Sequence, residues 1–294
     1  MASAIKSTLR KIVRAYLSYT PLKKGRYPLM MLSNKYTSES VSVTVSTKDR
    51  GFMKLDLDDM AQVPLFYNIY EWRDTPTIEA LSTGSNTILD IGGNIGQMAL
   101  LFAKFAKKVF TFEPIPETAD RLQENINLNN LGERIVLSNV ALTNFIGKIS
   151  FGLPPAGNRG TGSTVITEQS KNRLIEVDAI TLDEFIRSNK VTKIDLIKMD
   201  IEGAELFALQ GMREMLTAPD KPIIILEMTI GMMRQAGYGS RELLDFLSSY
   251  GYDCYEFVSG GLKGPLTSVI PQSENYCFLT KYHQGLDKVK RILV

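Results

Sequence analysis

The sequence feature that most constrains the fold is a glycine-rich turn that joins a run of apolar residues to a segment with helical character. ILDIGGNIGQMALLFAK, residues 88–104, contains this turn, and its first four residues end a short apolar segment. Apolar runs then alternate with helix-like segments along the chain. Two of these runs, IDLIKM at 194–199 and PIIILEM at 222–228, have the continuous apolar character of strands buried on both faces. The alternation predicts an α/β fold with a doubly wound, mostly parallel sheet.

The same pattern divides the chain into three expected parts. Residues 1–60 form an N-terminal extension with a basic helix and a β-hairpin, residues 61–284 form the main domain, and residues 285–294 form a C-terminal tail. The hairpin is predicted over 41–57, because VSVTVSTKDRGFMKLDL alternates around KDRG.

Within the main domain, three segments are predicted outside the parallel core. Residues 63–83 are expected to form a helix that leads into the sheet, and 252–258 with 275–281 are expected to form an antiparallel hairpin at its C-terminal edge. Residues 146–180, rich in Gly, Thr and Ser around PPAGNRGTGST, predict an inserted β-hairpin. Insertions at that end of a sheet usually shape a substrate site.

The charge of the chain is unevenly distributed. Residues 1–38 contain eight Lys and Arg residues and no acid, although the whole chain has a net charge of only +2. Ile5, Leu9, Ile12 and Tyr16 recur there at helical spacing, which predicts an amphipathic helix flanked by cations. Three interpretations stay open: a docking helix with a solvated basic face, peripheral contact of residues 1–20 with an anionic membrane, and a mitochondrial transit peptide.

Several classes of protein are excluded by composition. The chain has no run of 18 apolar residues and no secretory signal, so we expect a cytoplasmic protein, peripheral at a membrane if the N-terminal helix binds lipid. Cys254, Cys277 and the single histidine, His283, fit no metal-ligand spacing. We therefore exclude a histidine metal cluster and assign no metal ligands, but whether a divalent metal held by the acids assists stays open. We expect no nucleic-acid partner, and the oligomeric state stays open.

The glycine turn also indicates what the fold binds. Ligands of open α/β sheets lie beyond the carboxyl ends of the strands, where glycine lets a ligand approach the backbone closely. Glu113, 23 residues after Asp90, ends the next predicted strand, where its carboxylate can accept hydrogen bonds from two ribose hydroxyls. The dinucleotide fingerprint requires glycine at its first, third and sixth places, which here are Gly92, Asn94 and Gln97. The pattern disfavours a pyrophosphate and suits S-adenosylmethionine, which carries an amino acid end and a sulfonium cation.

A second motif places charges at the end of another strand. IDLIKMDIEGAE, residues 194–205, puts Lys198 and Asp200 on the same side of an apolar strand. Burying a charge is costly without a partner or a purpose, so this pair favours a functional site. Glu202 and Glu205 follow in the turn, where carboxylates also stabilise the N-terminus of a helix.

These motifs together resemble the FkbM family of S-adenosylmethionine-dependent methyltransferases. The segments that carry the resemblance are ILDIGGNIGQMALLFAK, VFTFEPIPE, LQENINLNN, NVAL at 139–142, ITLDEF at 180–185 and DLIKMDIEGAELFALQGM at 195–212. The resemblance covers about residues 70–280 and implies the class I methyltransferase fold, which is Rossmann-like. It also implies methyl transfer to oxygen, on a sugar, a glycan or another hydroxylated natural product. At position 93 the family more often has alanine. We expect the glycine of this chain to leave cofactor binding unaltered.

The resemblance also implies roles for individual residues. The residues expected to bind the cofactor are Asp90, Gly92, Gly93, Asn94, Gly96, Glu113, Asn139, Val140 and Ala141. Asp90 is expected to order the turn and face the methionine end, Glu113 to hold the ribose, and Asn139 with its two neighbours to flank the adenine. Asp200 is expected to be the catalytic base, with Glu202 as the alternative.

Two other classes of function stay open. One is an oxidoreductase that uses a nicotinamide cofactor, which the incomplete glycine fingerprint disfavours. The other is a non-catalytic membrane-surface protein with a methyltransferase-like fold. A scaffold does not need Asp90, Glu113 and Asp200 together, so their presence disfavours this second class.

Overall fold

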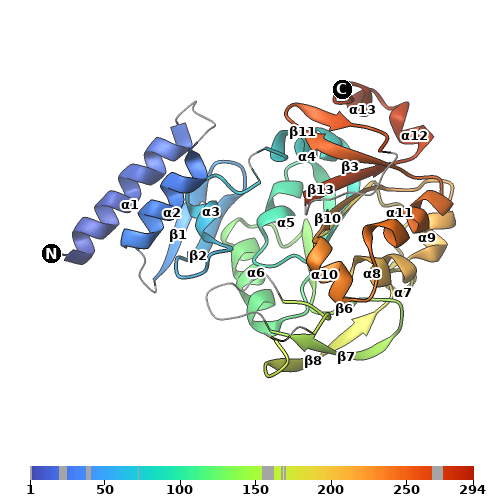
Figure 1. The fold of residues 1–294 in the computed structure, drawn as a ribbon, viewed down its shortest axis with the longest axis horizontal. Helices are drawn as coiled ribbons and strands as arrows, with labels where there is room; N and C mark the ends of the chain where they lie inside the picture. The colour runs from blue at the N-terminus through green and yellow to red at the C-terminus, as the bar shows by residue number, and fades with distance from the viewer. Residues whose placement is uncertain are drawn as a thin grey trace.

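The computed structural model describes residues 2–19, 25–37, 41–71, 73–153, 162–166, 168, 170–266 and 274–294. Its centre is an eight-stranded sheet with the order β12-β11-β13-β10-β9-β3-β4-β5 (Figure 1). The strands are β3 (Ser85–Ile91), β4 (Ala106–Phe112), β5 (Ile135–Ser138), β9 (Leu196–Met199), β10 (Ile223–Met228), β11 (Asp253–Val258), β12 (Gly261–Lys263) and β13 (Glu274–Leu279).

The strand directions confirm the predicted sheet. Strands β5, β4, β3, β9 and β10 are parallel, and β13 lies antiparallel between β10 and β11. The predicted antiparallel pair at the C-terminal edge is therefore present, with β11 outside β13. The short strand β12 extends this edge by pairing antiparallel with β11.

Helices cover both faces of the sheet, as expected for a doubly wound fold. One face carries α4 (Thr75–Ser82), α5 (Gln97–Phe102) and α6 (Pro116–Leu128); the other carries α7 (Leu182–Ser188), α8 (Glu205–Gln210), α9 (Arg213–Thr217), α10 (Ile230–Gln235) and α11 (Ser240–Ser249). Successive residues of a strand point to opposite faces, so Ile88 and Leu89 of β3 belong to two separate hydrophobic clusters.

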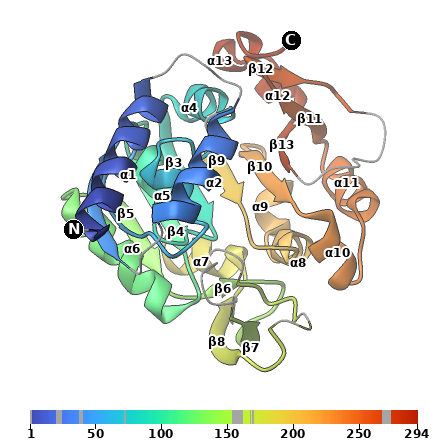
Figure 2. The same cartoon turned by 60° about the vertical axis from the view of Figure 1, so that its left-hand side comes forward.

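The N-terminal extension packs on the first of these faces (Figure 2). It contains α1 (Ala2–Tyr19), α2 (Arg26–Thr37) and the antiparallel pair β1 (Ser42–Thr47) and β2 (Gly51–Asp56), which confirms the predicted hairpin. Leu17 and Met30 join the same hydrophobic cluster as α5. Asn125 of α6 accepts a hydrogen bond of 2.7 Å from the Lys54 backbone. The domain boundary at residue 60 stays a prediction, since residues on both sides of it share one core.

The segment predicted as a C-terminal tail is also packed on the domain. It follows α12 (Lys281–Gln284) and contains α13 (Asp287–Lys290), whose Val289 is fully buried. Lys288 donates a hydrogen bond of 2.7 Å to the Leu81 carbonyl at the end of α4.

The single helix predicted over 63–83 is wrong. The structure has a short α3 (Val63–Phe66), an irregular segment, and then α4. Asn68 and Glu71 have φ values of 57° and 43°, which a right-handed helix does not allow. The interruption matters because the irregular segment lies beside the ends of the central strands.

The predicted insertion forms a second, three-stranded sheet, with the order β6-β8-β7. It contains β6 (Ala141–Leu142), β7 (Gly147–Gly152) and β8 (Leu174–Ile180), and β7 pairs antiparallel with β8, which confirms the hairpin. Residues 154–161 of its tip lie outside the described residues. Ser163 donates a hydrogen bond of 2.8 Å to the Glu202 carbonyl, so the insertion contacts the loop after β9.

Candidate functional site

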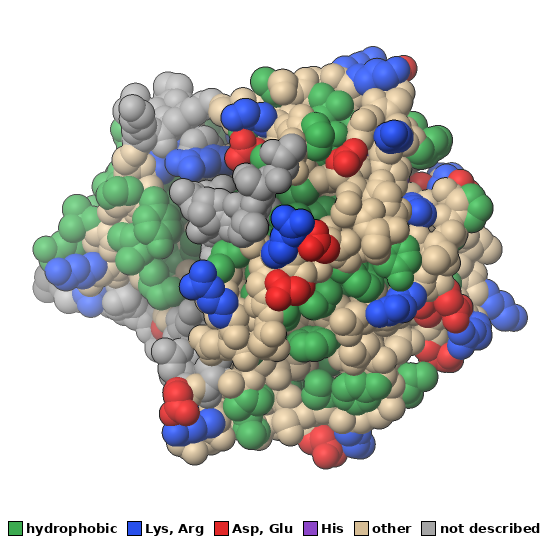
Figure 3. All heavy atoms as spheres, turned by 45° about the vertical axis from the view of Figure 1, so that its right-hand side comes forward, with side chains coloured by type: hydrophobic (Ala, Val, Ile, Leu, Met, Phe, Trp, Pro, Cys, Tyr) green, Lys and Arg blue, Asp and Glu red, His purple; other side chains and the backbone are tan. Residues whose placement is uncertain are grey.

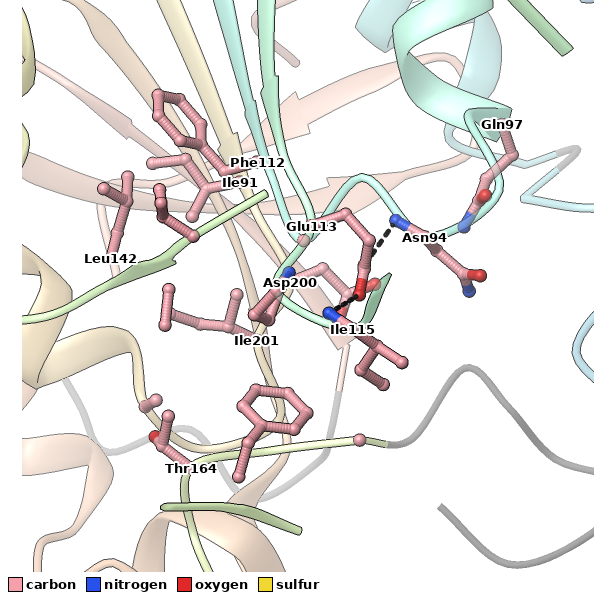
Figure 4. Close-up of a pocket in the computed structure, with 17 residues that line it drawn as sticks. Ile91, Asn94, Gln97, Phe112, Glu113, Ile115, Leu142, Thr164, Asp200 and Ile201 are labelled. Carbon is pink, nitrogen blue, oxygen red and sulfur yellow. Dashed lines mark hydrogen bonds between the residues drawn. The ribbon is translucent and has the colours of Figure 1, made fainter. Parts of the chain in front are cut away.

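A pocket lies at the carboxyl ends of β3 and β9. β3 and β9 are neighbours in the sheet. From β3 the chain continues to β4 on one side, and from β9 it continues to β10 on the other side, so the strand order reverses between β3 and β9. Open α/β sheets bind ligands at such positions. We call this cavity the strand-end pocket (Figure 4); Gly92, Glu113 and Asp200 are among the residues that line it.

The glycine turn brings three strands close together. The backbone N–H groups of Gly92 and Gly93 both donate to the Phe112 carbonyl, at 3.0 and 2.9 Å. Gly92 has a φ of 91°, and a Cβ atom there would overlap the Asp200 carbonyl. A Cβ atom at Gly93 would overlap the Thr111 hydroxyl. An alanine at this position therefore has no room beside Thr111 in this chain.

Asp90 lies behind the turn. It is buried, accepts a hydrogen bond of 3.1 Å from the Thr111 hydroxyl, and is absent from the residues that line the pocket. Burial raises the pKa of Asp90 to about 7, although the Thr111 hydrogen bond opposes this shift. The structure thus places Asp90 where it supports the turn, and not on the pocket surface that the sequence analysis assigned to it. Gly93 and Gly96 likewise shape the turn without lining the pocket.

Glu113 faces the pocket and is held by two backbone groups. Its carboxylate accepts hydrogen bonds of 2.9 Å from the N–H groups of Asn94 and Ile115 (Figure 4). Burial raises the pKa of Glu113 to about 7, and the two backbone hydrogen bonds oppose this shift. Each carboxylate oxygen has a second lone pair. Glu113 can therefore accept further hydrogen bonds from the hydroxyls of a ligand.

The walls around Glu113 are mainly apolar. The apolar residues are Ile91, Phe112, Pro114, Ile115, Val140, Ala141, Leu142, Phe151, Ile201 and Ala204. Asn139, which we expected to contact an adenine, does not line the pocket; its amide donates a hydrogen bond of 2.7 Å to the Glu113 carbonyl. Apolar walls beside an acceptor carboxylate suit a flat ring attached to a polyhydroxylated group.

A larger cavity of about 1140 Å³ adjoins the strand-end pocket, and we call it the outer cavity. Asn94, Gln97 and Asp200 line both cavities, so the two adjoin at these residues. Gln97 is 6% exposed, and its Oε1 atom has no hydrogen-bond partner among the described residues. A buried acceptor without a donor is rare and indicates a ligand or water contact.

Charged side chains surround the end of β9. Lys198 is fully buried, and its Nζ lies 3.8 Å from Oε2 of Glu227. Glu227 is on β10, the strand next to β9 in the sheet. Burial alone would lower the pKa of Lys198, but the carboxylates of Asp200, Glu71 and Glu227 raise it above its usual value. Repulsion by Asp200, followed by burial, raises the pKa of Glu227 to about 9. The sequence analysis missed Glu227, although an acid at the end of the apolar run PIIILEM was the available signal.

The loop after β9 is held in a strained form. Glu202 has a φ of 51°, a conformation that is costly for residues other than glycine and is frequent at functional sites. Glu205 accepts hydrogen bonds from the Gly203 backbone at 3.1 Å and from the Tyr238 hydroxyl at 3.1 Å. Glu205 therefore positions the loop, while Glu202 lines the outer cavity. Burial and the neighbouring Asp200 raise the pKa of Glu202 to about 7.

The two cavities contain no evident metal site. Among the residues that the structure describes, no three His, Cys, Asp or Glu side chains are arranged to hold a metal ion.

The family follows from the sequence that builds this site. The model of the methyltransferase FkbM domain matches residues 90–254, more than half of the chain. The chain belongs to the FkbM methyltransferase family. The match begins at Asp90 and includes Glu113, Asp200 and Glu227.

Two curated relatives are similar over part of their length. A hexuronic acid methyltransferase of Haloferax volcanii is 34% identical over 147 residues, which cover 50% of this chain and 57% of that protein. A 2-O-methyltransferase of Sinorhizobium fredii is 30% identical over 190 residues, which cover 59% of this chain and 75% of that protein. The match thus spans little more than half of the first relative.

Among solved structures, an FkbM methyltransferase from Methylobacillus flagellatus is 15% identical, with a TM-score of 0.44. The similarity covers 93% of this chain and 58% of that one. A SAM-dependent O-methyltransferase from Thermotoga maritima is 13% identical, with a TM-score of 0.40 and coverage of 84% and 80%.

Proposed function

We propose that this protein is an S-adenosylmethionine-dependent O-methyltransferase whose acceptor is a hydroxyl of a sugar, a glycan or another hydroxylated small molecule. The observation that carries the proposal is the position of two adjoining cavities at the strand ends: a pocket with Glu113 and apolar walls shares Asp200 with a cavity large enough for an acceptor. The relatives support a sugar acceptor, because one is a hexuronic acid methyltransferase and another a 2-O-methyltransferase.

The residues of the strand-end pocket fit the cofactor. Glu113 would accept hydrogen bonds from the ribose hydroxyls, and Val140 and Ala141 would contact the adenine. Asn94 and the unpaired Oε1 atom of Gln97 would face the amino acid end. The remaining predicted cofactor residues, Asp90, Gly92, Gly93, Gly96 and Asn139, would act by shaping the turn and by holding the backbone of Glu113.

The chain itself would supply alignment and a base. When bound, the cofactor supplies a methyl group activated by its sulfonium, and the acceptor oxygen takes the methyl carbon while the carbon–sulfur electron pair stays on sulfur. Asp200 lines both cavities and would accept the hydroxyl proton. A well-placed base contributes about 10²- to 10⁴-fold in rate. Glu202, on the wall of the outer cavity, is the alternative base.

The proposal is tested by cofactor binding. We expect S-adenosylhomocysteine to bind the purified protein and to raise its melting temperature, because a ligand that binds only the folded state stabilises it. Binding of NAD and NADP is measured in the same way, to test the competing oxidoreductase interpretation. Saturable calorimetric binding of a nicotinamide cofactor, without binding of S-adenosylhomocysteine, would reject the methyltransferase proposal.

We further propose that α1 makes a peripheral contact with an anionic membrane. One face of the helix packs on the domain through Leu17, but Ile5, Ile12 and Tyr19 remain 67%, 61% and 88% exposed. Lys11 is exposed on this helix and Lys6 is half-buried, whereas Arg10 is buried and Arg14 donates hydrogen bonds to the Phe66 and Ser46 carbonyls. Figure 3 shows hydrophobic and basic side chains at the edge of the molecule where Figure 1 draws α1 and α2. An apolar face flanked by cations is typical of helices that lie on anionic lipid. None of the described helices is long and apolar enough to cross a membrane.

The membrane contact is tested with vesicles of phosphatidylcholine and phosphatidylserine. We expect the protein to sediment with them at low salt and to be released at high salt, because salt screens exposed charges. Ile5→Ser with Ile12→Ser should reduce sedimentation several-fold while leaving S-adenosylhomocysteine affinity unchanged. Ile146→Ser, at an equally exposed apolar residue far from α1 in sequence, is the control. Equal sedimentation of the double variant and the parent would reject the contact.

A further inference from the structure

The outer cavity has walls from parts of the chain that are distant in sequence. One wall comes from the irregular segment and the start of α4, and its residues are Ile69, Tyr70, Glu71, Arg73, Asp74, Pro76 and Thr77. Another wall comes from the end of β11 and the turn after it, residues 257–260. Asn275 of β13 also lines the cavity, and Asp200 and Glu227 lie at its inner end, after β9 and on β10. This inner end is where the cavity meets the strand-end pocket.

The titratable groups that line this cavity are mostly acidic. Its described lining contains five carboxyl groups and one guanidinium group. The carboxyl groups belong to Glu71, Asp74, Asp200, Glu202 and Glu227, and the guanidinium group belongs to Arg73. Lys198 is buried beside them and does not line the cavity. At neutral pH the raised pKa values of Glu202 and Glu227, about 7 and about 9, leave the first carboxyl partly and the second mostly protonated.

The carboxyl groups also affect one another. Repulsion from Asp200 is the largest cause that raises the pKa of Glu227, and burial followed by the same neighbour raises the pKa of Glu202. Carboxylates that repel each other are stabilised by a proton or by a cation. An additional anion in the cavity would increase the repulsion.

Three residues that line the cavity have buried acceptor atoms without partners among the described residues, and Lys198 Nζ, buried beside the lining, is a donor without a hydrogen-bond partner there. Asn275 is 7% exposed; its Nδ2 atom donates to Asp74 at 3.0 Å, and its Oδ1 atom has no partner among the described residues. The buried Oε2 of Glu71 and Oε1 of Gln97 also lack partners there. Buried acceptors without donors are costly. A ligand with several O–H or N–H donors would satisfy them.

We propose that the acceptor site takes neutral or amino-bearing polyhydroxylated molecules and discriminates against acidic ones, such as uronic acids. The inference rests on the proposed methyltransferase function and specifies its substrate class. The acids of the outer cavity, together with the buried acceptors of Asn275 and Gln97, select hydroxyl and ammonium donors. The carboxyl groups that stay ionised disfavour a carboxylate, because like charges placed together in an interface reduce affinity.

The test uses three p-nitrophenyl glycosides that share one ring and differ at a single group: a glucoside, a glucosaminide and a glucuronide. With labelled S-adenosylmethionine, we expect kcat/KM for the glucuronide to be at least about tenfold lower than for the other two. The difference should appear mainly in KM, since the charge effect acts on binding. Equal or greater efficiency with the glucuronide would overturn the inference while leaving the methyltransferase function intact.

A charge-removing variant sharpens the test. Asp74→Asn keeps the shape of the side chain that faces Asn275 but removes one negative charge, so the glucuronide should improve about threefold or more relative to the glucoside. Asp245→Asn, on the exposed face of α11, should leave the ratio unchanged. An unchanged ratio in Asp74→Asn would contradict a role of this carboxylate in discrimination.

A second measurement tests the inference if the natural acceptor is not among the three glycosides. The enzyme is incubated with labelled S-adenosylmethionine and a small-molecule and glycan extract, and the labelled products are separated on anion and cation exchangers. Labelled product that passes the anion exchanger supports the inference, and product retained there overturns it. Absence of label in every fraction would reject methyl transfer itself, and the inference with it.

Discussion

Glu113→Ala should lower the affinity for S-adenosylhomocysteine by about 10- to 150-fold. Hydrogen bonds to a charged group contribute about 1.5–3 kcal/mol, and the substitution removes both carboxylate oxygens that face the strand-end pocket. It also leaves the backbone N–H groups of Asn94 and Ile115 without their acceptor. The affinity is measured by calorimetry, alongside the melting temperature of the variant.

Two controls separate the ligand contact from a general loss of structure. Asp120→Ala removes an exposed acid from α6 and should leave affinity unchanged. Glu113→Gln keeps the side-chain shape and one acceptor oxygen, so its affinity should fall between those of the parent and the alanine variant. Parental affinity in a folded Glu113→Ala protein would remove Glu113 from the ligand site.

Asp200→Asn should reduce turnover about a hundredfold or more while changing S-adenosylhomocysteine affinity far less. Asparagine has nearly the same shape as aspartate but does not accept a proton at neutral pH, so alignment is kept and base catalysis is lost. A hundredfold loss corresponds to about 2.7 kcal/mol on the barrier. Turnover and affinity are measured on one preparation with the best acceptor from the glycoside panel.

The neighbouring acids provide the comparison for this prediction. Glu202→Gln and Glu227→Gln each remove one other carboxylate of the outer cavity, and each should reduce turnover less than Asp200→Asn. If Asp200→Asn loses affinity but keeps near-parental single-turnover rates at saturating cofactor, Asp200 is a binding residue. If Glu202→Gln has the larger effect on rate, Glu202 is the base.

The glycine turn shows how local sequence predicted much of the site. Apolar runs and the helix-like runs between them depend mainly on neighbours in sequence, and they predicted the mostly parallel core and its antiparallel edge, but not the strand order. The position of Glu113 also followed, because a residue that ends a strand of a parallel sheet lies at the edge where ligands bind. Asp200 was predicted at the same edge for the same reason, and both line the strand-end pocket.

Side-chain direction within the turn was not predictable in this way. Asp90 and Asn139 also come from strand ends, but Asp90 bonds Thr111 and Asn139 bonds the Glu113 carbonyl. Which strand-end residues face the ligand and which support the backbone depends on contacts between neighbouring strands. The single helix predicted over 63–83 failed for a related reason: helical propensity does not reveal the left-handed residues Asn68 and Glu71.

By itself, the sequence determined the α/β alternation, the glycine turn and the identity of the acids at the strand ends, because these are set by short-range patterns. The tertiary structure alone decided that Glu71, Asp74 and Glu227 share one cavity with Asp200, and that Asn275 joins them from β13. The insertion of β13 between β10 and β11 and the irregular segment before α4 produce this arrangement. Repulsion between carboxylates and the cost of burying them depend on distances in space, and residues 71 and 275 approach each other only in the folded chain.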